Sequence, residues 1–185
     1  MRLFVAAYPP ASVCDDLEER LAGLAVSRAA AGGVNTRLAR RETWHVTLAF
    51  LGEVGDERVS DAAAAVERAA VGPAPELRLT GGGRFGRGQF TVLWVGVAGD
   101  GLDDLARRVR RELKKTRIPY DTRPFRPHLT VARPGDRLDR EAIEADRALL
   151  AGYRGPSWPV AEVRLMRSHL GPRPTYDRIG GWPLT

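Results

Sequence analysis

The sequence contains a single cysteine, Cys14, among its 185 residues. One cysteine excludes an internal disulfide and any zinc site built from several cysteines, and it favours a reducing, cytoplasmic compartment. No apolar run approaches the ~18 residues that a membrane-spanning helix requires. The N-terminal MRLFVAAYPP also lacks the longer apolar region and the small-residue cleavage site of a secretory signal. We therefore expect a cytoplasmic protein that does not enter a membrane.

Lysine is almost absent, since Lys114 and Lys115 are the only lysines among 29 basic residues. With 23 acidic residues the formal net charge is +6. A guanidinium is planar and suits phosphate recognition, and a positive balance favours a phosphate-bearing partner such as RNA. A GC-rich genome also produces an arginine bias, so composition alone indicates no chemistry. The length fits one ordinary domain, and 43% apolar residues suffice for a packed core.

Hydrophobic periodicity predicts strands and helices that alternate along the chain. Helices are expected from a capping box at Ser12 and Asp15 to Gly32, from Asp56 to Ala70, and over 101–117 and 139–151. Strands are expected over 2–7, 44–51, 76–80, 89–98, 126–132, 160–169 and 175–184. Several strands follow one another without a helix between them, which predicts an α+β fold with largely antiparallel sheet. The segment 99–101 is the expected boundary between two lobes.

Two segments of the chain repeat the same pattern. Residues 45–52 read HVTLAFLG and residues 128–135 read HLTVARPG, so both follow His-x-Thr-x-Ala with a glycine seven residues after the histidine. Side chains alternate along a strand, so each histidine shares a face with its threonine while the aliphatic residues face the core. We expect the two His-Thr pairs to face each other across one cleft.

That arrangement suits catalysis at phosphorus. Two imidazoles with pKa values near 6.5 can serve as one base and one acid at neutral pH. The hydroxyls of Thr47 and Thr130 can donate to the oxygens of a central phosphate and align it with both rings. A single His-x-Thr on a strand is usually structural, and a metal site is another alternative. However, neither motif segment, 45–52 or 128–135, contains an acidic or cysteine residue that could serve as a further ligand.

The sequence resembles the two-histidine (2H) phosphoesterases, specifically the RNA 2′,3′-cyclic phosphodiesterases, also called bacterial 2′-5′ RNA ligase-like proteins. The resemblance is carried by the two motifs and by the segments RLFVAAYPP, TWHVTLAFLGEV, FRPHLTVARP and SHLGPRPTYDRIGGWPL. The resemblance implies one bilobal domain over 1–185, with two pseudosymmetric lobes of largely antiparallel sheet, outer helices, a central cleft and one motif per lobe. It also implies hydrolysis of a terminal 2′,3′-cyclic phosphate to a 2′-phosphate without metal or cofactor. The implied partners are RNA ends or cyclic nucleotides, and we expect a monomer.

The resemblance assigns roles to individual residues. It makes His128 the proton acceptor that activates water and His45 the proton donor to the departing 3′-oxygen, with Thr47 and Thr130 on the phosphate. Arg133 occupies a position where the family often has an arginine, which implies phosphate binding. A regular strand would direct Arg133 to the face opposite His128, so this role requires that the strand end or bulge near it.

The glycine-rich GGGRFGRG matches the G-x-G-x-x-G pattern of dinucleotide-binding loops. That pattern indicates dinucleotide binding only when a helix follows it, and here a strand follows. We therefore expect a loop beside the cleft, in which Phe85 could stack on a base. Two other activities stay open: 2′-5′ RNA ligation and hydrolysis of another cyclic phosphate. A noncatalytic RNA-end-binding protein is an alternative of a different class, and the two intact motifs argue against it.

Overall fold

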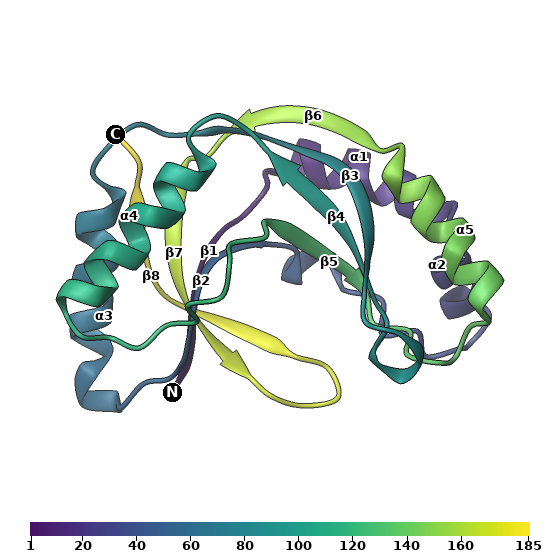
Figure 1. The fold of residues 1–185 in the computed structure, drawn as a ribbon, viewed down its shortest axis with the longest axis horizontal. Helices are drawn as coiled ribbons and strands as arrows, with labels where there is room; N and C mark the ends of the chain where they lie inside the picture. The colour runs from purple at the N-terminus through teal and green to yellow at the C-terminus, as the bar shows by residue number, and fades with distance from the viewer.

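The computed structural model describes all 185 residues, which form two lobes lying side by side (Figure 1). Each lobe has one four-stranded antiparallel sheet with helices on its outer face. Lobe A has the strand order β2-β1-β7-β8 and is covered by α3 and α4. Its elements are β1 (Arg2–Ala7), β2 (Val46–Glu53), α3 (Val59–Ala70), α4 (Leu102–Lys115), β7 (Glu162–His169) and β8 (Thr175–Pro183).

Lobe B has the strand order β5-β4-β3-β6 and is covered by α1, α2 and α5. Its elements are α1 (Ala11–Ala22), α2 (Ala25–Ala31), β3 (Glu76–Phe85), β4 (Val92–Ala98), β5 (His128–Ala132), α5 (Arg140–Ala151) and β6 (Arg154–Pro159). The edge strands β2 and β5 contact each other at the junction of the lobes. This architecture confirms the predicted α+β class and antiparallel sheets. None of the helices is both long and apolar enough to cross a membrane.

The chain passes back and forth between the lobes, so segment 99–101 does not separate two contiguous halves. Helices α1 and α2 pack in lobe B although they lie between two strands of lobe A in the sequence. Helix α4 likewise follows β4 of lobe B but covers the sheet of lobe A. Neither lobe is a continuous stretch of sequence, which explains why a glycine-rich joint was a poor indicator of a boundary.

The first helical segment was predicted as one helix and is two. The predicted capping box is also wrong, because α1 begins after Pro10 with no side-chain cap. The break falls at Gly23, and the carboxylate of Asp146 in α5 accepts hydrogen bonds from the amides of Ala25 (2.6 Å) and Val26 (3.0 Å) at the start of α2. A carboxylate near a helix N-terminus satisfies amides that otherwise lack partners. The partner is more than a hundred residues away, so local sequence does not reveal it.

The glycine-rich segment also differs from the prediction, because β3 continues through Gly81, Gly82 and Gly83 to Phe85. A Cβ at Gly83 would lie 2.7 Å from the indole of Trp94. A Cβ at Gly82 would lie 2.6 Å from Leu150 of α5. The absence of side chains therefore lets an aromatic ring and a helix pack directly on the strand.

Strand β6 was not predicted. Its sequence RGPSWP contains two prolines, which are tolerated at a sheet edge, and β6 is the edge strand of lobe B.

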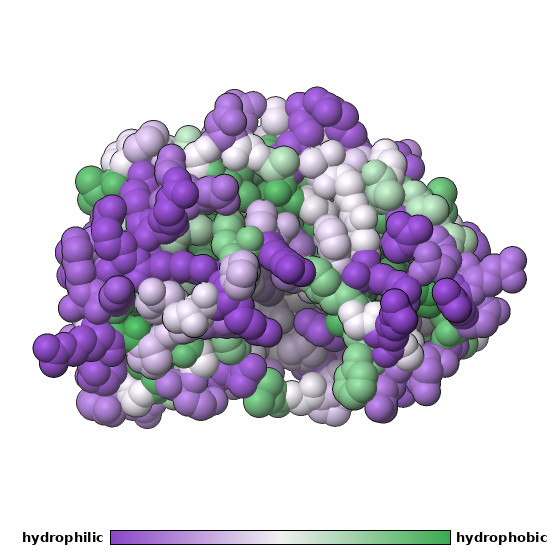
Figure 2. Space-filling model, in the orientation of Figure 1, coloured by the Kyte–Doolittle hydropathy of each residue, from purple (hydrophilic) through white to green (hydrophobic).

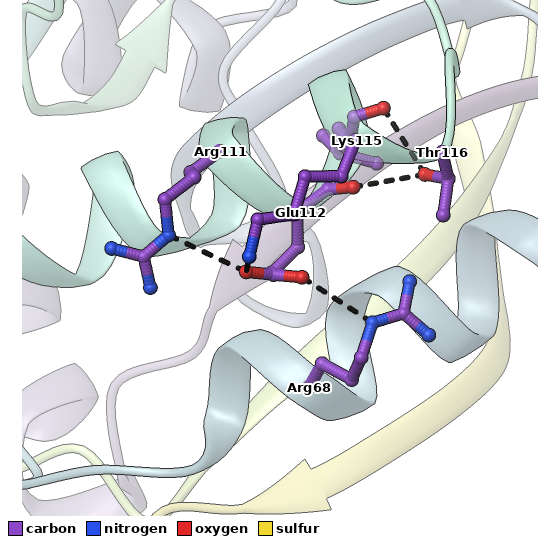
Figure 3. A network of polar contacts seen from close by, with 6 residues as sticks. Arg68, Arg111, Glu112, Lys115 and Thr116 are labelled. Carbon is purple, nitrogen blue, oxygen red and sulfur yellow. Dashed lines mark hydrogen bonds and ion pairs between the residues drawn. The ribbon is translucent and has the colours of Figure 1, made fainter.

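Lobe A is further stabilised by a polar cluster between its two helices, centred on Glu112 of α4 (Figure 3). The Glu112 carboxylate is 5% exposed and accepts hydrogen bonds from Lys115 (2.8 Å), from Arg68 of α3 (3.3 Å) and from Arg111 (3.4 Å). The Lys115 hydrogen bond is the main cause of a lowered pKa of Glu112. The cluster joins α3 to α4 on the outer face of lobe A.

Candidate active site

His45 precedes β2 and is held by its own main chain. Its Nδ1 lies 2.7 Å from the carbonyl oxygen of Thr43. A carbonyl oxygen can only accept, so Nδ1 carries the proton that it donates, and Nε2 is the nitrogen left to titrate. This anchor sets both the tautomer and the direction of the ring.

His128, at the start of β5, is anchored in the same way. Its Nδ1 lies 2.7 Å from the carbonyl oxygen of Arg126, again two residues earlier in the chain. The motifs therefore share a local geometry as well as a sequence, and each presents a free Nε2. The charges of the two rings also interact, since His128 contributes to lowering the pKa of His45.

Both motif strands contain an extra residue at the same position of the motif. In β2, Thr47 pairs with Ala6 and Ala49 with Val5, so Leu48 has no partner of its own in β1. In β5, Thr130 pairs with Trp94 and Ala132 with Leu93, so Val131 is the extra residue. Such a β-bulge reverses the alternation of side chains beyond it.

The bulge decides where Arg133 points. Ala132 and its partner Leu93 are both fully buried in the core, so the next residue, Arg133, projects to the opposite face, which His128 and Thr130 share. Its charge also acts on Tyr176 of β8 in lobe A. The equivalent residue after the bulge in β2 is Phe50, which packs against Phe4 on the corresponding face of lobe A. Arg133 therefore reaches the space between the lobes despite its odd spacing from His128.

Thr47 and Thr130 are half-buried and follow their histidines on the same face of each strand. The hydroxyls of Thr36, Thr43 and Thr91 donate to main-chain carbonyls within hydrogen-bonding distance. Thr47 and Thr130 make no such bond in the chain, so their hydroxyls are free to donate to a bound anion. Figure 2 shows the hollow between the two lobes, with hydrophilic side chains around its mouth.

Three aromatic rings surround His45, and no sequence motif indicates them. The ring centroids of Phe4, Tyr176 and Tyr8 lie 4.8, 5.2 and 5.7 Å from that of His45. Burial among them lowers the pKa of His45 from 6.5 to about 4, and the Thr43 carbonyl opposes this only in part. The available signal was the first strand, in which Phe4, Ala6 and Tyr8 alternate with residues of the core and are themselves apolar or aromatic.

Aromatic rings also flank His128 in lobe B. Phe85 at the end of β3 lies edge-on to His128 with centroids 5.0 Å apart, and it stacks on Trp94 at 5.0 Å. Trp94 lies 6.3 Å from His128 and rests on Gly83. Arg84, the neighbour of Phe85, points the other way and pairs with Glu144 of α5. The structure thus brings Phe85 beside the second motif and leaves Arg84 outside the site.

The remaining histidine and the cysteine lie elsewhere. His169 is on β7 and its Nε2 lies 2.6 Å from Asp177 of β8. Cys14 is buried in α1, where burial raises the pKa of its thiol. Cys14 lines a cavity of about 750 Å³ that also includes Tyr8 and Trp44 but neither motif histidine.

Comparison with known proteins agrees with this geometry. A family model described as the 2′-5′ RNA ligase superfamily matches residues 4–172. The RNA 2′,3′-cyclic phosphodiesterase of Archaeoglobus fulgidus is 32% identical over 97% of this chain and 98% of its own length. That of Geobacillus stearothermophilus is 34% identical over 77% of this chain, and the match spans only 46% of that relative.

Solved structures agree as well. The crystal structure of E. coli LigT complexed with 3′-AMP superposes with a TM-score of 0.75 at 26% identity, covering 100% of this chain and 98% of the other. That of TT0787 from Thermus thermophilus superposes with a TM-score of 0.73 at 29% identity, covering 100% and 98%. With two anchored His-x-Thr motifs on the contacting strands β2 and β5 and a family match over nearly its whole length, the chain belongs to the 2′-5′ RNA ligase superfamily of two-histidine phosphoesterases.

Proposed function

We propose that this protein is an RNA 2′,3′-cyclic phosphodiesterase that opens terminal cyclic phosphates to 2′-phosphomonoesters by acid–base catalysis. The observation that carries the proposal is the repeated motif geometry, in which two histidines donate through Nδ1 to a main-chain carbonyl and keep Nε2 free. Relatives at 31–34% identity bear this enzyme's name. Both histidines come from one chain, so a monomer suffices.

The reaction proceeds by in-line displacement at phosphorus. His128 Nε2 accepts a proton from water as the water oxygen forms a bond to phosphorus. The bond from phosphorus to the 3′-oxygen breaks, and His45 Nε2 protonates that oxygen. Thr47 and Thr130 donate to the non-bridging oxygens, and Arg133 neutralises their charge. The products are a free 3′-hydroxyl and a 2′-phosphate, and proton exchange with solvent resets the two histidines.

Phe85 is proposed to stack on a base near His128, because it is half-buried beside that ring and lies on the cleft face of β3. In a ligation reaction, the 5′-hydroxyl of another RNA chain would attack the cyclic phosphate in place of water, the bond from phosphorus to the 3′-oxygen would break, and a 2′-5′ linkage would result. The family model named for 2′-5′ RNA ligases favours this as a second activity of the same site.

The test is to incubate the protein with 2′,3′-cyclic nucleotides in EDTA and to identify the product by chromatography. The expected product is the 2′-monophosphate, and kcat/KM should have a bell-shaped pH dependence. His45→Ala and His128→Ala should each lower kcat/KM at least ~100-fold, within the range of a lost acid or base. His169→Ala is the matched control, because it removes the third histidine outside the site. Unimpaired turnover by either motif variant would refute the mechanism.

A further inference from the structure

The end of β5 in lobe B is surrounded by arginines that lack an acidic partner. The Arg133 amide donates to the carbonyl of Arg37 (3.3 Å), and the Arg137 guanidinium donates to the carbonyl of Asn35 (2.9 Å). Several arginines elsewhere, such as Arg41 and Arg164, pair with carboxylates. The side chains of Arg37 and Arg133 make no ion pair, and both are exposed.

The loop between β3 and β4 extends this surface. A Cβ at Gly135, just past the end of β5, would lie 3.4 Å from the carbonyl oxygen of Gln89, so the loop and the turn after β5 are in contact. On that loop Arg87 is exposed and unpaired, and the Phe90 side chain is 72% exposed. We call the set Arg37, Arg87, Phe90, Arg133 and Arg137 the lobe B rim. Asp136 is adjacent to Arg137 in the sequence and is exposed.

The equivalent end of β2 in lobe A has different chemistry. Phe50 stands in the place of Arg133, and Arg2 lies over its ring at 4.7 Å. Beyond it, Glu53 and Asp56 lie 3.6 and 3.7 Å from the N-terminal ammonium group. The unpaired arginines at the end of β5 therefore have no counterpart at the equivalent end of β2, where the charged side chains lie against an aromatic ring or the N-terminal ammonium group. In Figure 1 the β3–β4 loop lies at the lower edge of lobe B, away from β6.

We propose that the lobe B rim binds the single-stranded nucleotides that precede the cyclic phosphate, so that the preferred substrate is an RNA chain rather than a mononucleotide. Single-stranded nucleic acid is typically bound by cationic side chains along its phosphates and by aromatic rings under its bases. Arg37 and Arg87 contact phosphates, and Phe90 supports a base upstream of the reacting nucleotide. This inference rests on the proposed function, because the cyclic end must occupy the two-histidine site.

The experiment compares two substrates, a 2′,3′-cyclic mononucleotide and a five-nucleotide RNA with the same cyclic end. Phe90→Ala should lower kcat/KM for the oligonucleotide roughly tenfold, as expected for one lost base stack, and leave the mononucleotide reaction unchanged. The matched control is Leu170→Ala, since Leu170 is 73% exposed at the tip of the β7–β8 hairpin in lobe A. All of these side chains are exposed, so the variants should fold.

Salt dependence tests the phosphate contacts. The oligonucleotide with a 2′-phosphate end, the product of the reaction, is titrated by fluorescence anisotropy at several salt concentrations. The variant Arg37→Gln/Arg87→Gln should reduce the slope of log Kd against log salt by about 1.4, since each single-strand phosphate contact contributes ~0.7. Arg154→Gln, which removes an exposed unpaired arginine on the far edge strand β6, should leave the slope unchanged.

The outcomes separate this inference from the proposed function. Equal losses of kcat/KM on both substrates in Phe90→Ala, or no loss on the oligonucleotide, would overturn the proposed role of the lobe B rim. The protein would still be a cyclic phosphodiesterase. If the wild type hydrolysed neither substrate, the proposed function would fail. The anisotropy titration would still decide whether the rim binds RNA, because unchanged affinity and slope in the variants would overturn it.

Discussion

Binding of a phosphate group between the two histidines should raise the pKa of His45 sharply. In the free protein, burial among aromatic rings holds this pKa at about 4, so His45 is neutral at pH 7 although the proposed donor must carry a proton. One pH unit corresponds to about 1.36 kcal/mol, so a return to 6.5 requires about 3.4 kcal/mol of favourable interaction. Two unit charges 4 Å apart interact by ~4 kcal/mol at an effective dielectric constant of about 20. A single phosphate charge beside Nε2 is therefore sufficient.

The measurement is an NMR titration of 15N-labelled imidazoles, first with the free protein and then with saturating nucleoside 2′-monophosphate. The pKa of His45 should move from about 4 to above ~6 on binding. His128→Gln, which removes the smaller contribution of the neighbouring charge, should shift the free value only slightly upward, because burial is the larger cause. A pKa near 6.5 in the free protein would contradict the effect of burial. An unchanged low value in the complex would contradict His45 as the donor.

The same depressed pKa predicts a pH dependence of stability, with a definite sign. Below pH ~6.5 the unfolded chain binds a proton at His45, whereas the folded protein binds it only near pH 4. The free energy of unfolding should therefore fall as the pH falls through this window, by up to about 3.4 kcal/mol from this group. Urea unfolding at pH 7 and pH 4.5 measures the change. His45→Phe, which fits an aromatic environment, should reduce the difference, and an equal difference in the variant would refute the assignment.

Four further substitutions test other parts of the structure. Thr47→Val and Thr130→Val should each lower kcat/KM about 100-fold with an unchanged melting temperature, because each removes a hydrogen-bond donor to the phosphate and keeps the side-chain shape. Unchanged kinetics would show that the hydroxyl concerned has no role in the site. Asp146→Asn should lower the free energy of unfolding by about 1–3 kcal/mol in urea titrations, since it weakens the cap of α2, and an unchanged midpoint would contradict that role. Glu112→Gln should cost about 1 kcal/mol, less in high salt because its partners are exposed, and equal stability at all salt concentrations would show that the cluster contributes nothing.

Local sequence predicted those elements whose apolar pattern is self-contained. Helices α4 and α5 were expected over 101–117 and 139–151 and occupy Leu102–Lys115 and Arg140–Ala151. Errors arose where a distant group determines the local structure. Asp146 stabilises the break between α1 and α2 from another helix. The indole of Trp94 covers Gly83, which makes the glycine-rich segment part of a strand rather than a loop.

The site residues also divide into those that local sequence predicts and those whose placement depends on distant parts of the chain. The repeated motif identified two histidines and two threonines, because one strand period is enough to place a histidine and a threonine on the same face. The orientation of Arg133 depends on the bulge at Val131, which only the pairing with β4 reveals. The ring of Tyr176 reaches His45 from the last strand of the chain. No spacing rule connects residues that far apart.

The two motifs are alike in main-chain geometry and unlike in their surroundings, and in the proposed mechanism this difference gives the reaction a direction. If the surroundings of the two histidines were strictly symmetric, either ring could serve equally well as the proton donor. Instead, His45 lies among three aromatic rings and its pKa is lowered to about 4, while Arg133 extends from the strand of His128 and Phe50 occupies the matching place in lobe A. In the proposed mechanism the donor is therefore protonated only in the complex with substrate. The exchange Arg133→Phe with Phe50→Arg should therefore impair catalysis even though it preserves the composition of the cleft.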